Sequence, residues 1–296
     1  MLSSRNGGVD PNSLTADNFR PLKGFSDLPL ATNGAYANYN ALQVTWVRQK
    51  GRYTINMNYT HGKAMGIVNS GIPANPNLDQ YNLANNYGVQ PANRKQIFNA
   101  AYSIELGSPV HDKIAGGFLN GWQLSGITQI QSGANLTGFS SNANFGMNLN
   151  GAKIPGTDFN ISNVSLLGTN DIQLSPVLTC NPAGGLGKNQ FINPSCFGIP
   201  NAIGLNGPTV LPAIYGPAFF NSDLGLFKNF QFKEARKLQL RLNATNFLNH
   251  PLWSFNGSNL TLGFDPNTGK VNTPLFGTVT QKQGHRIVQA AIKFYF

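Results

Sequence analysis

Residues 41–60 read ALQVTWVRQKGRYTINMNYT, and this stretch decides the fold. From Leu42 to Trp46 every second residue is apolar, and the residues between them are Gln and Thr. After the polar turn 49–52, residues 53–60 alternate in the same way. A period of two residues is typical of a strand with one apolar and one polar face. Two such runs around a short turn that contains glycine predict a β-hairpin.

The polar face of this hairpin is uncharged, since it carries Asn, Gln and Thr instead of Lys, Glu and Arg. The whole chain shows the same bias, because only 11% of its 296 residues are charged, against about 25% in a typical soluble domain. A neutral polar face suits a crowded aqueous interior. Strands that are apolar outside and polar inside are typical of outer-membrane β-barrels. The 33 Gly and 18 Pro also disfavour a long helical fold.

Five further segments alternate in the same way: 96–106, 121–131, 223–232, 237–246 and 286–296. Lys228 is an exception among the apolar positions of its segment. The apolar residues of 121–131 change phase around Gly126, which predicts a slip in the pairing there. The sequence therefore predicts an all-β fold, an antiparallel outer-membrane β-barrel fragment of about seven long strands with long extracellular loops.

The connections between these segments alternate strictly between short and long. The short ones are 49–52, 107–120 and 233–236, and the long ones are 62–93, 138–217 and 248–284. An outer-membrane barrel has short periplasmic turns and long extracellular loops. If the last strand ends on the periplasmic side, every short connection falls on that side too. A compact soluble domain rarely holds three structureless connections of such length.

Charge and hydropathy exclude several other classes of protein. The net charge is +10 and the pI is about 9.7, which would suit nucleic acid or an anionic surface. The Lys and Arg residues are dispersed, however, so we expect no nucleic-acid partner. No apolar stretch approaches the length of a transmembrane helix. Residues 1–10 lack the apolar core of a signal peptide.

The last eight residues, 289–296, read QAAIKFYF. Gln289, Phe294 and Phe296 resemble the polar and aromatic positions of the C-terminal assembly signal of bacterial outer-membrane proteins. Ala291 stands where that signal usually has Gly. The resemblance implies the barrel assembly machinery as a partner, which can pair with a terminal strand by β-augmentation.

A set of short segments, taken in order, resembles the distal barrel of Oar-like TonB-dependent receptors. Those proteins often begin with a carboxypeptidase-regulatory-like domain. The resemblance covers nearly the whole chain from Asn38 onwards. In one departure, His61 and Gly62 replace the usual Trp-Ser before Lys63. The segments that carry it are 38–44, 59–64, 121–126, 131–133, 193–197, 220–224, 228–230, 241–251, 276–279 and 286–289.

This resemblance implies a barrel of about 22 strands with an N-terminal plug, in the cell outer membrane and in contact with its lipid. Residues 1–38 would then be part of an extracellular loop, and 39–296 the C-terminal portion of the barrel. The N-terminal barrel, the plug and the contact with the TonB system would lie in a missing part. The implied function is uptake of large nutrients such as glycans, peptides or chelates. We expect the chain to be inactive alone, because unpaired sheet edges in lipid cost several kcal/mol per unsatisfied group.

Two alternatives stay open. The chain could be a small surface or secreted β-rich binding or adhesion protein, which would have a closed hydrophobic core between two sheets. It could also be a remnant without activity.

Few residues are candidates for chemistry. Cys180 and Cys196 share one extracytoplasmic loop, which suggests a disulfide, with a free buried pair as the alternative. The four His show no paired spacing and no nucleophile elbow occurs, so we expect no enzyme, no metal and no cofactor. Trp46, Tyr59 and Trp122 suit the aromatic girdle of a barrel. The loop aromatics that could touch a ligand, or equally pack within the loops, are Tyr81, Tyr87, Phe145, Phe191, Phe197 and Trp253.

Overall fold

The computed structural model describes residues 22, 24–25, 33–67, 79, 81–138, 149, 151–169, 172–233 and 236–296. Seven long strands follow one another in chain order across one sheet, and each neighbouring pair is antiparallel. They are β1 (Ala37–Lys50), β2 (Tyr53–Ile67), β4 (Gln96–Glu105), β5 (Trp122–Gln131), β8 (Phe219–Lys233), β9 (Arg236–Thr245) and β12 (Ile287–Tyr295). Each predicted segment is one of these strands, so the all-β antiparallel prediction is confirmed.

The smaller elements lie in the connections. The strand β3 (Tyr87–Val89) pairs with the end of β2, while β6 (Val177–Leu178) pairs with β7 (Phe197–Gly198) and β10 (Leu252–Ser254) pairs with β11 (Gln281–Gln283). The helices are α2 (Lys113–Leu119) and α3 (Asn163–Leu167), and the 3-10 turns are Leu83–Asn86, Leu136–Gly138, Pro194–Cys196 and Gly257–Leu260. None of the helices in the described ranges is long and apolar enough to cross a membrane.

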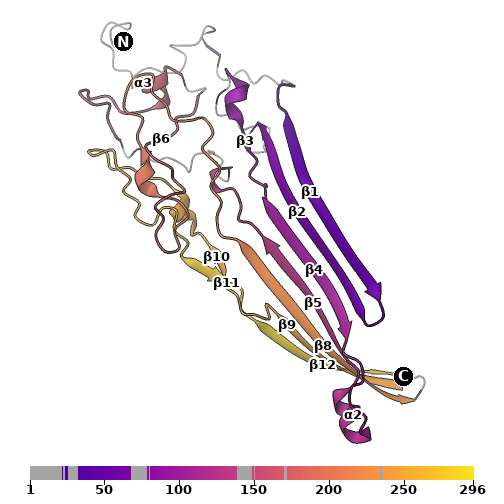
Figure 1. Ribbon diagram of the computed structural model, residues 1–296. Coiled ribbons are helices and arrows are strands. Elements are labelled where there is room, and N and C mark those ends of the chain that lie inside the picture. The colour runs from indigo at the N-terminus through magenta and orange to yellow at the C-terminus, as the bar shows by residue number, and fades with distance from the viewer. Residues whose placement is uncertain are drawn as a thin grey trace.

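The connections at the two ends of the sheet differ in length, as the sequence predicted. The short connections, α2 and the C-terminus lie at one end, which we call the short-turn end (Figure 1). The elements α3, β6, β10 and β11 lie toward the other end, which we call the loop end (Figure 1). The strands therefore run up and down as the alternation of short and long connections required.

Several predicted boundaries were wrong. The predicted start of the connection 62–93 lies too early in the sequence, because β2 continues to Ile67 and β3 pairs with it. The connections 138–217 and 248–284 are not structureless, since they hold α3 and two small strand pairs. The connection 107–120 is more than a turn, because it contains α2. Most of the predicted loop 1–38 lies outside the described residues, and β1 already begins at Ala37.

The predicted slip at Gly126 was also wrong. The pairing of β5 runs without interruption from Trp122 to Gln131 against β8, and Gly126 pairs with Tyr102 and Leu224. A Cβ atom at Gly126 would come within 2.5 Å of the Tyr102 hydroxyl oxygen. The glycine therefore interrupts the apolar pattern because it makes room for a neighbouring tyrosine. Ile127 simply faces the polar side of the sheet.

One face of the sheet is apolar and uncovered. Cross-strand partners share a face, so the register puts Val44, Tyr59, Phe98, Ile130 and Phe220 in one row on this side. Trp46 and Trp122 are on the same face, as Tyr59 is. Large side chains on this face remain exposed, among them Leu42, Val44, Trp46, Leu242, Val288 and Ile292. An apolar surface of this extent marks contact with a partner or a membrane.

The hydrophobic core lies in the loops instead of between two sheets. We call residues 132–218 and 246–286, as far as they are described, the loop cap. Its main cluster joins Leu136, Ile192 and Phe197 of the first loop to Phe264 and Phe276 of the second. A second cluster surrounds Leu166. In the described part of the chain no second large sheet covers the first, which removes the structural basis of the two-sheet alternative.

Candidate functional site

The other face of the sheet, which we call the polar face, carries rows of uncharged side chains. One row runs across five strands through Thr45, Asn58, Asn99, Gln129 and Asn221. These groups hydrogen-bond along and across the strands, as where the Thr45 hydroxyl donates to Asn58 Oδ1 at 3.0 Å. The face can therefore bind water or polar groups through amides and hydroxyls without a strong electric field.

A second row on this face contains Thr54, Ser103, Ser125, Gly225 and Asn243. The row Asn56, Ala101, Ile127 and Asp223 separates it from the first. The Ser125 hydroxyl donates to Ser103 Oγ at 3.1 Å. Together with residues of the neighbouring strands, the second row lines a concavity of about 540 Å³. The concavity includes a single carboxylate, Asp223. Ile127 and Phe227 also line it, so the concavity combines apolar surface with hydroxyls and amides and carries little charge.

Asp223 also ties the sheet to the loop cap. Its Oδ1 accepts from the Asn246 backbone N–H at 2.8 Å and from the Asn221 side chain at 3.1 Å. Asn246 is buried at φ +48°, in the left-handed region that Asn tolerates better than most residues. Its Nδ2 donates to the carbonyls of His250 and Gly284 at 3.0 and 2.9 Å. One asparagine thus joins the end of β9 to both limbs of the loop that follows.

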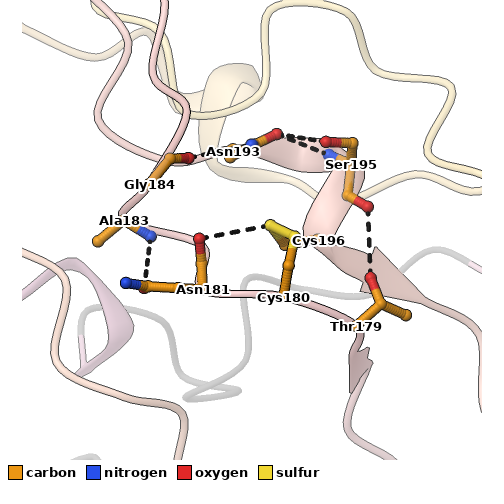
Figure 2. Close-up of a disulfide and its surroundings, with 8 residues drawn as sticks. All are labelled: Thr179, Cys180, Asn181, Ala183, Gly184, Asn193, Ser195 and Cys196. Atoms are coloured by element: carbon orange, nitrogen blue, oxygen red, sulfur yellow. Dashed lines mark hydrogen bonds between the residues drawn. A yellow bond between two sulfur atoms is a disulfide. The ribbon is translucent and has the colours of Figure 1, made fainter.

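Cys180 and Cys196, the pair considered for a disulfide, are bonded in the structure. Figure 2 shows how the surrounding loop is held. Asn193 Nδ2 donates to the Gly184 carbonyl at 3.0 Å, and Asn193 Oδ1 accepts from the Ser195 N–H at 3.1 Å (Figure 2). Cys196 is fully buried beside the main cluster. The disulfide therefore fastens an exposed loop tip to the core of the cap.

Replacing Cys180 and Cys196 by serine should loosen this loop. The cysteines are 16 residues apart, and closing a loop of that length contributes about 3 kcal/mol. We expect faster hydrogen exchange at the Asn193 amide, which donates to the Pro182 carbonyl inside the ring. Ser195→Ala is the control, because it removes only one hydroxyl donor to Asn193. Equal protection in both variants would show that the disulfide does not hold the loop.

The loop aromatics are in different environments. Phe197 packs edge-on against Phe276 inside the main cluster at 5.7 Å, and Phe191 packs edge-on against Phe255 at 6.0 Å. These two rings serve the core of the cap, so a ligand would not meet Phe197 at the surface. Phe145 lies outside the described residues.

The remaining three aromatics keep accessible surface. Tyr81 is exposed, and its backbone N–H donates to Asp79. The Tyr87 ring stacks on Tyr36 at 5.3 Å. Trp253 is half-buried with Lys282 Nζ 4.6 Å above its ring. The structure places these residues on separate elements and does not gather them into one site.

The residues of the C-terminal motif occupy both faces of β12. Gln289 and Ala291 pair with Asn243 and Arg241 on the polar face, whereas Phe294 pairs with Leu238 on the apolar face. Phe296 follows the strand, and its ring lies 6.3 Å from that of Phe294. Both aromatic rings are exposed.

No group of three or more metal-binding side chains occurs among the residues placed by the structure. The isolated carboxylates instead hold turns. Asp265 Oδ1 accepts from the Thr268 N–H at 2.8 Å and from the Thr268 hydroxyl at 3.0 Å. These two bonds, with a third from the Asn267 N–H, lower the pKa of Asp265 below its usual value.

Acidification should therefore loosen the turn 265–270. The carboxylate form is stabilised in the fold, so its contribution is present above the ordinary Asp pKa and is lost as pH falls through the lowered value. NMR titration of Asp265 should show this lowered midpoint. Thr268→Val removes the hydroxyl donor and should move the midpoint back up. An unchanged midpoint in that variant would contradict the assigned cause.

Sequence reasoning missed two features near the sheet. The helix α2 has an Asp N-cap at Asp112, a recognisable start signal. The core of the cap has no local signal, because its members come from two distant loops.

A family model described as an outer membrane beta barrel domain matches residues 5–289. No curated protein and no solved structure matches the chain.

Proposed function

Because this chain belongs to the family of outer membrane beta barrel domains, we propose that its sheet is the C-terminal part of the barrel wall of a TonB-dependent receptor. The protein is located in the cell outer membrane. Its apolar face meets lipid and its polar face lines the interior, since this is how strands alternate in such barrels. The proposed cargo is a large nutrient such as a glycan, a peptide or a chelate.

The observation that carries this proposal is the polar face, which is largely uncharged and has a folded cap at one end. Its rows of hydroxyls and amides border a concavity of about 540 Å³. A wall of this kind lets a large hydrophilic cargo pass without trapping it by charge. The loop cap lies at the loop end, which is the extracellular end in the proposed orientation. The exposed Tyr81, in the loop after β2, and the half-buried Trp253 of the cap are candidates for first contact with the cargo.

The edges of the sheet support a larger barrel. Among the described residues, β1 pairs with β2 alone and β12 pairs with β9 alone along the path of long strands. An open edge is not tolerated in the hydrocarbon region. We propose that an N-terminal part of the same receptor supplies the closing strands, the plug and the link to the TonB system. The chain alone would then be inactive in transport, and it would have no enzymatic role.

The assembly machinery is the second proposed partner. The strand β12 is exposed along its whole length, and its outer edge is free in the described sheet. Gln289, Ala291, Phe294 and Phe296 would present this edge to a strand of the machinery by β-augmentation.

The reading frame upstream of Met1 tests the receptor proposal. We expect an in-frame extension that encodes a signal peptide, a plug and the remaining strands. Expression of that complete frame should then give uptake that stops when the TonB system is deleted. An in-frame stop close upstream, together with a separate ribosome-binding site, would refute the proposal. The chain would then act through its cap as a surface-binding protein.

A further inference from the structure

The connection between β4 and β5 contains the short helix α2, which is capped at both ends. Asp112 caps α2, since its Oδ1 accepts from the N–H groups of Ile114 and Ala115 at 2.9 and 2.8 Å. Asn120, which ends the helix, exchanges two hydrogen bonds with the backbone of Val110 at 3.0 and 2.7 Å. The hydrogen bonds of Asp112 and Asn120 therefore hold both ends of α2 in place.

This helix docks on the apolar face of the sheet. The Phe118 ring lies edge-on to Phe230 at 6.3 Å, and Trp122 Nε1 donates to the Phe118 carbonyl at 2.8 Å. Lys228 is buried between the rings of Trp122 and Phe230, with Nζ 5.9 and 5.1 Å from their centroids. Its ammonium donates to the Asn120 carbonyl at the end of the helix. The lysine that broke the apolar pattern thus fastens α2 to the outer wall.

Outside its contact with Phe230, α2 keeps a large apolar surface exposed. Ile114 is 78% exposed, Phe118 66% and Leu119 59%. Residues four apart share a helix face, so Ile114 and Phe118 lie together, with Leu119 beside them. Lys113 is rotated by about 100° from Ile114 and by about 140° from Phe118 around the helix axis. No described segment of the chain covers Ile114, since three-quarters of its surface is open.

The position of α2 along the wall matches one boundary of a membrane. From Phe220 to Phe230 the strand β8 advances about 34 Å along its own axis. At a tilt of about 45° this spans about 24 Å across the membrane, against about 25 Å for the apolar band of such barrels. Phe220 and Phe230 then mark the two boundaries. Because α2 contacts Phe230, it lies at the boundary on the short-turn side, which is the periplasmic side.

This end of the protein is also basic. The acidic residues in and beside the short connections are Glu105, Asp112 and Glu234. They are outnumbered by Arg48, Lys50, Arg52, Lys113, Arg236 and Lys237. Basic groups beside an apolar helix face favour binding at a membrane surface, where anionic headgroups lie above the acyl chains.

We propose that α2 is an interfacial anchor that inserts Ile114, Phe118 and Leu119 into the periplasmic leaflet of the outer membrane and binds anionic phospholipid there. The anchor lies at the short-turn end of the wall (Figure 1) and fixes the depth of the β4–β5 turn. This inference rests on the outer-membrane location and on the proposed orientation of the strands. It holds whether or not the protein is a TonB-dependent receptor.

Fluorescent probes at single cysteines test the anchor, because both native cysteines are engaged in a disulfide. The protein is reconstituted, together with the strands that close its barrel, in vesicles of phosphatidylethanolamine and phosphatidylglycerol, and an environment-sensitive dye is attached at Ile114→Cys, Lys113→Cys or Leu242→Cys. Brominated lipids then report contact with acyl chains. We expect the Ile114 probe to shift to the blue and to lose about half of its emission, as for a helix about 5–10 Å into the boundary.

The other two positions are the matched controls. The probe at Lys113 should stay in water. The probe at Leu242, in the middle of the wall, should be quenched by bromines that lie deeper in the bilayer than those that quench the probe at Ile114. Replacing phosphatidylglycerol by phosphatidylcholine should weaken the Ile114 signal and leave the Leu242 signal in place. Equal signals at Ile114 and Lys113 would refute the anchor. A silent Leu242 probe would refute the membrane location on which the anchor depends.

Discussion

Replacing Phe276 by alanine should destabilise the loop cap by about 3–5 kcal/mol, the usual loss for a fully buried phenylalanine. The Phe276 side chain is 0% exposed and packs edge-on against Phe197, which comes from the other loop of the cap. The residue after it, Gly277, leaves no room for adjustment, since a Cβ there would come within 2.5 Å of the Ile192 Cβ. The cavity can therefore collapse only in part.

Hydrogen exchange measures this loss where the two loops meet. The Phe191 N–H donates to the Gly277 carbonyl at 2.7 Å. Its exchange should become more than a hundredfold faster, because about 1.4 kcal/mol corresponds to a factor of ten. Leu275→Ala is the matched control, because Leu275 is adjacent in sequence and 53% exposed. If both variants exchanged alike, the two loops would not share one core.

Replacing Leu242 by arginine should weaken the membrane-inserted state by about 2–4 kcal/mol, the cost of a cation on the lipid face near the middle of the bilayer. Leu242 pairs with Leu226 on the apolar face, roughly midway between Phe220 and Phe230. Its side chain is exposed and has room for the longer residue. The charge, and not a steric clash, therefore causes the loss.

The neighbouring residue gives the control. Asn243 pairs with Gly225 on the polar face, so Asn243→Arg puts the same charge on the wet side of the wall. The fraction of chain inserted in lipid vesicles is measured against urea concentration for both variants. We expect a lower midpoint for Leu242→Arg and a nearly unchanged one for Asn243→Arg. The reverse order would mean that the two faces have been assigned the wrong way round.

The contrast between these two neighbours also explains why the sheet could be predicted from the sequence. Successive side chains of a strand point to opposite faces. Each strand of a sheet between lipid and water therefore alternates apolar and polar residues. That pattern is local, and 41–60 already contains it. The alternation of short and long connections then settles the order of the strands, because each strand must return across the same wall.

The helix α2 shows where local patterns are too weak. Asp112 is a good N-cap, and Ile114 and Phe118 are spaced for one helix face. A helix of seven residues is nevertheless marginal in water by itself. Its docking depends on Lys228 and Phe230, which are more than a hundred residues away. The sequence shows Lys228 only as an exception in an apolar run.

The strands, their faces and their up-and-down order follow from the sequence, because residue alternation and loop length are properties of neighbouring residues in the chain. The tertiary structure decided the rest. It brought Leu136 and Phe276 into one core, gave Gly126 its place beside Tyr102, and turned Asn246 into the link between wall and cap. These arrangements depend on contacts between residues far apart in the chain, and the free energy of such contacts leaves no periodic mark in the sequence.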